Sequence, residues 1–185
     1  MKVIPTTLKD VLIVEPKVFE DSRGFFLETY HRNRYRELGI DRPFVQDNLS
    51  SSVKGTIRGL HFQVRHPQAK LVHVIAGEIL DVAVDIRKDS PTFGQWTGIR
   101  LSDRNKRQVF IPEGFAHGFC VISDAVLFSY KCSDFYYPDD ELGILWSDPD
   151  LAVDWPVAEP IISEKDKRLP HLSDISTDHL PTGYS

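Results

Sequence analysis

The sequence has 185 residues and a net charge of −5, with 41% hydrophobic and 26% charged residues. This length and balance predict one globular domain over residues 1–185. The acidic balance argues against non-specific binding of nucleic acid, whereas a local group of Arg and Lys can still bind a small anionic ligand. No apolar run approaches the roughly 18 residues of a membrane-spanning helix, so no membrane partner is expected.

Two features favour the cytoplasm. The N-terminal residues lack the apolar core and small-residue cleavage site of a secretory signal. Cys120 and Cys132 both lie in apolar stretches, as buried free thiols do in proteins of a reducing compartment. We therefore expect a cytoplasmic protein in which neither cysteine forms a disulfide.

Short apolar segments separated by turn residues dominate the predicted structure. One amphipathic helix is expected first, at residues 32–38. The expected strands follow at residues 71–75, 78–86, 97–101, 108–111, 118–122 and 126–133. Ala76 and Gly77 give a hairpin signal between the first two strands, and the scarcity of polar residues in 79–86 predicts a strand covered on both faces. The tail from Asp148 is rich in Pro, Asp and Ser and is expected to form loops and short turns. Regular short strands of this kind predict an all-β sandwich or barrel.

Two segments resemble the two halves of the metal-binding motif of the cupin jelly roll. The first half reads G-x5-H-x-H-x3,4-E-x6-G, and Gly55, His61 and Gly77 keep three of its positions. Gln63 stands in place of the second His, and Lys70 stands near the position of the Glu. The resemblance implies an all-β cupin jelly roll with a few short helices.

The second half of the motif reads G-x5-P-x-G-x2-H-x3-N. Residues 112–117 keep the central P-x-G-x2-H, ending at His117, while Lys106 and Val121 replace the outer Gly and Asn. The implied ligand set is therefore His61, Gln63, Lys70 and His117. A protonated lysine offers no acceptor and repels a divalent cation, so this set suits a metal poorly. We predict a pocket without a metal, suited to an anion or a developing enolate.

A longer series of motifs gives a more specific resemblance. The segments are DSRGFFLE at 21–28, VQDNLS at 45–50, GTIRGLHFQ at 55–63, PQAKLV at 67–72, IPEGFAHGF at 111–119, YKC at 130–132 and SEKD at 163–166. In this order they are similar to the dTDP-4-dehydrorhamnose 3,5-epimerase family, and the resemblance runs from about residue 3 to 170. It implies conversion of dTDP-4-keto-6-deoxy-D-glucose to the L-rhamnose-series ketone by a homodimer that needs no cofactor.

The resemblance also implies roles for individual residues. His61 would be the base, oriented by Asp166, and Tyr130 would be the acid on the opposite face of the sugar ring. Lys70 would lie near the C4 oxygen. Five implied substrate-binding residues would lie along the pocket, namely Arg23, Gln46, Asn48, Arg58 and His117, and of these Arg23 and Arg58 would face the diphosphate. Phe25 and Phe26 would lie near the neighbouring subunit's nucleotide site. Glu28 would lie close to the base, and Tyr136 would lie beside the thymine.

The chemistry of the substrate calls for such residue types. The protons at C3 and C5 are α to the C4 ketone, so a base of near-neutral pKa such as His61 can remove them. A carboxylate on the second ring nitrogen fixes the tautomer, and a cation such as Lys70 stabilises the oxyanion. Inversion requires a second proton donor, the role of Tyr130. Arg58, three residues before His61, can share the pocket only on an irregular strand, because strand side chains alternate.

Other interpretations remain open at this point. Tyr130 could simply pack in the core, and isolated Arg23 and Arg58 could lie on the surface. Structural roles are expected for four further histidines, His31, His66, His73 and His171. A metal-dependent cupin dioxygenase or isomerase and a non-catalytic sugar-nucleotide binding module are alternative functions. Within deoxysugar pathways, 3-epimerases, 5-epimerases and 3,4-ketoisomerases share much of the same pattern.

Overall fold

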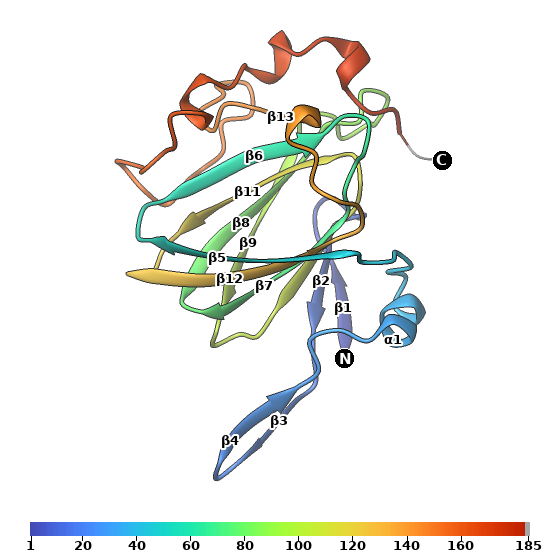
Figure 1. Cartoon of the computed structure of the whole chain (residues 1–185), viewed down its shortest axis with the longest axis vertical. Helices are drawn as coiled ribbons and strands as arrows, with labels where there is room; N and C mark the ends of the chain where they lie inside the picture. The colour runs from blue at the N-terminus through green and yellow to red at the C-terminus, as the bar shows by residue number, and fades with distance from the viewer. Residues whose placement is uncertain (184–185) are drawn as a thin grey trace.

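The computed structural model describes residues 1–183, which form two antiparallel sheets that face one another (Figure 1). The six-stranded sheet has the order β1 (Lys2–Pro5), β2 (Leu12–Glu15), β10 (Gln108–Ile111), β7 (Lys70–Ala76), β12 (Ala125–Cys132), β5 (Gln46–Val53). The five-stranded sheet has the order β13 (Glu141–Gly143), β6 (Ile57–Gln63), β11 (Phe115–Val121), β8 (Glu78–Asp85), β9 (Trp96–Ser102). The predicted all-β sandwich is confirmed. Tyr184 and Ser185, which the predicted domain includes, lie outside the described residues.

The remaining elements lie outside these two sheets. A two-stranded hairpin, β3 (Val18–Asp21) and β4 (Gly24–Leu27), projects from the body as an arm (Figure 1). The single α-helix of the described residues, α1 (Arg32–Glu37), matches the expected helix to within a residue. The C-terminal tail contains the 3₁₀ turns η2 (Asp166–Arg168), η3 (Leu172–Asp174) and η4 (Thr177–His179), and η1 (Pro138–Asp140) precedes β13. The expectation of loops and short turns after Asp148 is therefore confirmed.

Two apolar layers cover the two faces of the five-stranded sheet. Between the sheets, Ile79 and Ala83 of β8 pack with residues of the facing strands β7, β10 and β12. On the outer face, Val82 and Val84 of the same strand pack against the tail, including Trp155. Burial on both faces explains why this strand is nearly continuous in apolar residues. The tail is therefore part of the hydrophobic core and holds a fixed position against β6, β8 and β11.

The strands of the first half of the chain were not expected individually. Strands β1 to β6, and the three-residue β13, carry weaker signals than the central strands. In β5, alternate side chains such as Asn48 and Leu49 face the interior and the solvent, and several of the polar ones face inward. An interior polar cavity reverses the usual pattern of apolar residues inside, so hydrophobicity alone does not reveal this strand.

A bulge in β6 brings Arg58 and His61 to the same side of the sheet. His61 pairs with His117 of β11, but Arg58 pairs with Phe119, so three steps along β6 oppose two along β11. The irregular strand that Arg58 requires is therefore present. Gly59 lies in this bulge with φ +127°, and a Cβ placed on it would be 2.5 Å from the Cα of Gly118. The bulge depends on the close approach of two glycines.

We predict that Gly59→Ala strongly destabilises the protein, whereas Gly24→Ala does so less. Both glycines have positive φ, +127° and +132°, but nothing lies within 4 Å of a Cβ at Gly24. Gly24→Ala should cost about 1–3 kcal/mol from backbone strain alone. Gly59→Ala should cost at least a further ~1–3 kcal/mol because of the clash with Gly118. Urea unfolding of both variants measures the difference, and equal stabilities would show that the approach of β6 to β11 is not tight.

Candidate active site

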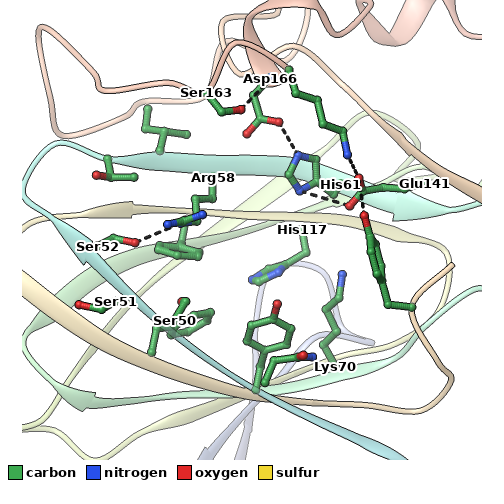
Figure 2. A pocket seen from close by; sticks show the side chains of 18 of the residues that line it. Ser50, Ser51, Ser52, Arg58, His61, Lys70, His117, Glu141, Ser163 and Asp166 are labelled. Carbon is green, nitrogen blue, oxygen red and sulfur yellow. Dashed lines mark hydrogen bonds and ion pairs between the residues drawn. The ribbon is translucent and has the colours of Figure 1, made fainter. Parts of the chain in front are cut away.

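A cavity of about 800 Å³ opens between the two sheets. Of the thirteen residues predicted for the site, nine line it, namely Gln46, Asn48, Arg58, His61, Lys70, His117, Tyr130, Tyr136 and Asp166. The strands that carry them are separated along the chain, and only the folding of the two sheets brings these side chains together (Figure 2).

The two sheets supply different chemistry to this cavity. His61 on β6 and His117 on β11 come from the five-stranded sheet. Lys70 on β7 and Tyr130 on β12 come from the six-stranded sheet that faces it. A ligand lying between the sheets therefore has His61 on one side and Tyr130 on the other.

His61 and Asp166 form a hydrogen-bonded pair. The Nε2 atom of His61 lies 2.8 Å from Oδ1 of Asp166, and the Gly59 N–H lies 3.5 Å from Oδ2 (Figure 2). Burial pushes the pKa of the Asp166 carboxyl upward, but the hydrogen bonds from His61, the Gly59 N–H and Ser163 outweigh this and hold the pKa below its usual value. The carboxylate is therefore ionised at neutral pH and acts as an acceptor.

This pairing leaves one ring nitrogen of His61 able to accept a proton. An ionised carboxylate can only accept, so Nε2 carries the proton that is donated to Asp166. Nδ1 is then left with its lone pair. The nearest carboxylate to Nδ1 is that of Glu141, whose Oε1 is 3.9 Å away. Neutral His61 can therefore accept a proton on Nδ1 from a ligand in the cavity.

Burial shifts the pKa values of Lys70 and Tyr130, both on the six-stranded sheet, in opposite directions. It lowers the pKa of Lys70, while the charges of Cys132 and Asp81 act to raise that pKa. Burial raises the pKa of the Tyr130 hydroxyl, and Arg58 partly opposes this effect. Tyr130 is therefore protonated at neutral pH and can act as an acid.

The other end of the cavity is rich in hydroxyl groups. Arg58 Nε donates to Ser52 Oγ at 3.0 Å, and the side chains of Ser50 and Ser51 lie along the same wall (Figure 2). Gln46, by contrast, lies at the Lys70 end of β5, the strand that carries these serines, where it accepts a hydrogen bond from the backbone N–H of Tyr136 at 2.9 Å. Arg and hydroxyl groups together are suited to phosphate oxygens.

Several lining residues were missed from the sequence. Glu141 lies between His61 and Lys165, forms an ion pair with Lys165 and accepts a hydrogen bond from the Tyr136 hydroxyl at 3.3 Å. Glu141 lies on a three-residue strand with no periodic signal. Lys165 falls within the quoted SEKD motif, so its position was available from the sequence. Asp81 does not line the cavity but binds the lining residue His117 at 2.7 Å, and it was visible as a charged residue that interrupts an apolar strand.

Four predicted site residues do not reach the cavity of their own chain. Arg23, Phe25 and Phe26 lie on the projecting arm, where Arg23 forms an ion pair with Asp21 at 2.6 Å. Glu28 follows the arm and pairs with Arg34 at 2.8 Å, not with His61. Within one chain, the expectation that Arg23 lines the pocket and Glu28 lies close to the base is therefore not met. The arm leaves the body before these residues, which separates them from the cavity.

Gln63 also differs from its expected position. It occupies a ligand position in the cupin motif, but it does not line the main cavity. Its amide donates to the carbonyls of His66 and Phe135 and accepts from the Tyr137 N–H. These three bonds turn Gln63 away to hold the loop that follows β12.

The other cysteine and histidine predictions can be compared with the structure directly. Cys120 and Cys132 are both buried and free, as predicted, and Cys132 in addition lines the cavity. His66 has a structural role, since it pairs with Asp140 at 3.0 Å and stacks on Tyr137. Across residues 1–183, no three His, Cys, Asp or Glu side chains gather in a way that could hold a metal ion. Within the same range, no helix is long and apolar enough to cross a membrane.

Comparison with known proteins identifies the family. Residues 5–174 match the family model of dTDP-4-dehydrorhamnose 3,5-epimerase. The chain belongs to this epimerase family. It is 55% identical over 167 residues to the dTDP-4-dehydrorhamnose 3,5-epimerase of Methanothermobacter thermautotrophicus, with 89% of this chain and 90% of the relative covered. It is 44% identical over 170 residues to a dTDP-4-dehydrorhamnose 3-epimerase of Streptomyces niveus, with 90% and 82% covered.

A solved structure supports both the fold and the class of enzyme. The chain superposes with a TM-score of 0.97 on a dTDP-6-deoxy-D-glucose-3,5-epimerase from Legionella pneumophila crystallised with dTDP-4-keto-L-rhamnose. The two are 51% identical, and the match covers 100% of this chain and 99% of the other. The chain is therefore an isomerase of the epimerase type, and its two-sheet fold is the predicted cupin jelly roll.

We predict that Asp166→Asn lowers kcat by roughly 10²–10⁴. The amide can present its N–H₂ to His61, which would place the imidazole proton on Nδ1 and remove the lone pair from the cavity. Asp174→Asn, which changes an exposed carboxylate in the next 3₁₀ turn, serves as the matched control. Steady-state kinetics of both variants measure the effect, and equal kcat values would show that Asp166 does not select the tautomer of His61.

Proposed function

We propose that the chain inverts C3 and C5 of dTDP-4-keto-6-deoxy-D-glucose by deprotonation and reprotonation, on the route to dTDP-L-rhamnose. The observation that carries this proposal is the position of His61 and Tyr130 on facing sheets across one cavity. Inversion at a carbon needs a proton removed from one face and another delivered to the opposite face. Two proton-transfer groups on opposite walls meet that requirement.

The first step is removal of a ring proton by His61. Nδ1 of His61 takes the proton from C3 or C5, and the electron pair of the broken C–H bond moves to the C4 oxygen as an enolate. The Asp166 carboxylate stabilises the resulting imidazolium through the 2.8 Å hydrogen bond to Nε2. The Lys70 ammonium stabilises the oxyanion, as a metal would in a metal-dependent cupin.

The second step is return of a proton by Tyr130. Its hydroxyl delivers a proton to the opposite face of the same carbon while the enolate collapses to the ketone. The raised pKa of Tyr130 keeps the hydroxyl protonated until that point. Solvent exchange then restores His61 and Tyr130 to their starting states, and the same cycle operates at the second carbon.

The dTDP portion has its own region of the cavity. Arg58 and the inward-facing serines of β5, Ser50 and Ser52, are suited to the diphosphate. Tyr136 lies at the opposite end of the cavity, beside Gln46 and Glu141, so its ring is not part of this region. Arg23, Phe25 and Phe26 of the arm would contribute to the nucleotide site of a neighbouring subunit. Three of the four positions that a single chain leaves outside its cavity are accounted for in this way, and the fourth, Glu28, pairs with Arg34 of its own chain.

A second candidate is epimerisation at C3 alone. The 44% identity to the Streptomyces niveus 3-epimerase favours it, whereas the 55% identity to a 3,5-epimerase favours inversion at both carbons. Both reactions use the same base and acid. Deuterium at C5 after turnover in deuterated water distinguishes them.

We predict that Tyr130→Phe in deuterated water incorporates label without inversion at one carbon or both. The variant keeps His61, Asp166 and Lys70 and deletes only a hydroxyl, so the enolate still forms and His61 returns a proton to the original face. NMR of the recovered sugar measures both label and configuration. Inversion of C3 and C5 at the wild-type rate would remove Tyr130 from the mechanism.

We propose that the protein is a homodimer. The arm exposes Phe19, Phe25 and Phe26, and the outer face of β5 exposes Leu49 and Val53, each more than half exposed. Apolar groups gathered in this way mark an interaction surface, and a second copy of the chain would cover them.

The dimer predicts a solution mass of about twice the 21.1 kDa of one chain. Sedimentation at micromolar concentration measures it. Phe26→Asp, which places a charge on a side chain that is 69% exposed, should shift the equilibrium toward monomer without unfolding the body. A wild-type protein that sediments as a monomer would count against the dimer.

We propose further that the cytoplasmic enzyme works without a metal or cofactor. Lys70 places a cation where metal cupins carry a carboxylate, which disfavours a divalent ion at this position. Purified protein should therefore contain no stoichiometric Zn, Fe or Mn, and EDTA should leave kcat unchanged. One tightly bound ion per chain, lost together with activity, would contradict this assignment.

A further inference from the structure

A buried carboxylate that the mechanism above does not use lies behind the cavity wall, in contact with the lining residue His117. Asp81 lies on β8 with no exposed surface, and its Oδ2 is 2.7 Å from Nε2 of His117. Its other oxygen, Oδ1, is buried and has no hydrogen-bond partner among the described residues. The inward neighbours of Asp81 on the same strand, Ile79 and Ala83, are apolar. A carboxylate in such surroundings needs compensating positive charge.

Two side chains that line the cavity compensate this carboxylate, His117 with a hydrogen bond and Lys70 with positive charge. His117 contacts Asp81 directly, and the charge of Asp81 acts on Lys70. In Figure 2, Lys70 and His117 lie close together at the end of the cavity away from Ser50 and Ser51. This is the end where the proposed mechanism requires positive charge for the C4 oxygen.

The charged and titratable groups around Lys70 come from three strands, β12, β11 and β8. Cys132 of β12 pairs with Lys70 in the sheet, and Tyr130 lies on the same strand. His117 of β11 and Asp81 of β8 are the other titratable groups. On the opposite side Lys70 pairs with Ile111 of β10, which is apolar. Asp81 is the one carboxylate of this group. The acidic residues that line the cavity have other partners, because Asp166 binds His61 and Glu141 pairs with Lys165.

We propose that Asp81 is a positioning residue for enolate stabilisation: its carboxylate orients His117 through Nε2 and places a buried negative charge that balances the Lys70 ammonium. The inference rests on the proposed function, because it concerns the enolate formed there. The site then has two carboxylate–histidine pairs with different roles. Asp166 leaves a lone pair on His61 directed to the ring proton, whereas Asp81 maintains positive charge beside the C4 oxygen.

The effect of the Asp81 charge on the pKa of Lys70 can be measured. Burial lowers the pKa of Lys70, and Asp81 acts against that change. Removal of the negative charge should lower the pKa of Lys70 further, so the ammonium is lost at a lower pH. Asp81→Asn is the appropriate change, since the amide keeps the shape and can still accept a hydrogen bond from His117 but carries no charge.

The test compares pH profiles of kcat for wild type, Asp81→Asn, Lys70→Arg and the double variant. Asp81→Asn should lower kcat by roughly 10–100-fold, the usual effect of changing a residue that orients a functional group. Its basic limb should move to lower pH, with little change in KM. In the Lys70→Arg background, Asp81→Asn should not move the basic limb, because a guanidinium does not titrate in this range.

A matched control separates charge from folding. Asp148 is a buried carboxylate in the tail that binds backbone N–H groups and does not line the cavity, so Asp148→Asn should lower stability without moving the pH profile. A wild-type kcat and basic limb in Asp81→Asn would overturn the proposal. A shift of the limb that persists in the Lys70→Arg background would also overturn it, because the charge would then act on another group.

Two further measurements cover the remaining cases. If Asp81→Asn does not fold, nitrogen-15 NMR of the wild-type histidines tests the same contact: His117 should carry a proton on Nε2 throughout the active pH range, and an unprotonated Nε2 would overturn the proposal. Exchange of the sugar ring protons by wild-type enzyme is measured in parallel. Absence of exchange would refute the proposed function itself, whereas exchange with an unaltered Asp81→Asn would refute only the role of Asp81.

Discussion

The hydrogen bond between His61 and Asp166 joins two parts of the chain that are 105 residues apart. His61 belongs to a strand of the sandwich, and Asp166 belongs to the tail that covers the outer face of the same sheet. The orientation of the base therefore depends on how the tail packs. Trp155, Leu172 and other apolar tail residues anchor it to the five-stranded sheet, so hydrophobic burial far from the cavity holds the carboxylate in place.

The two walls of the cavity carry different proton-transfer groups. One wall carries a histidine whose lone pair is directed inward by a carboxylate, and the other carries a protonated tyrosine and a lysine. A jelly roll supplies this arrangement readily, because its two sheets present side chains toward one another across a common interior. In this chain, Lys70 stands near the position of a metal-binding carboxylate, and in the proposed mechanism its ammonium stabilises the negative charge instead.

Most of the central fold could be predicted because its strands are apolar and bounded by strong turn signals. The double-sided burial of β8 followed directly from its composition. The polar strand β5 could not be predicted in the same way, because its inward-facing residues are polar and line the cavity, which departs from the usual pattern of apolar residues inside. The bulge at Gly59 was anticipated only from the need to place Arg58 beside His61, and the register shift shows how the chain achieves it.

The site was predicted where motifs name residue types, and missed where contacts arise from tertiary structure. Glu141 and Asp81 are single carboxylates whose partners lie on other strands, so their roles emerge only after the sheets are assembled. Arg23 and Glu28 show the opposite case. Their motif is clear, but the arm carries them away from the cavity of their own chain. In the proposed dimer the arm would reach the neighbouring subunit, a contact that the sequence of one chain does not position.

The central claim is that Nδ1 of His61 removes the ring protons. It is tested most directly by NMR of dTDP-4-keto-6-deoxy-D-glucose incubated in deuterated water with wild type and with His61→Ala. Wild type should introduce deuterium at C3 and C5 and invert both carbons. His61→Ala should slow the exchange at both carbons by roughly 10²–10⁴ while dTDP still binds, because the base contacts the sugar and not the nucleotide. Exchange at either carbon at the wild-type rate in His61→Ala would contradict the account.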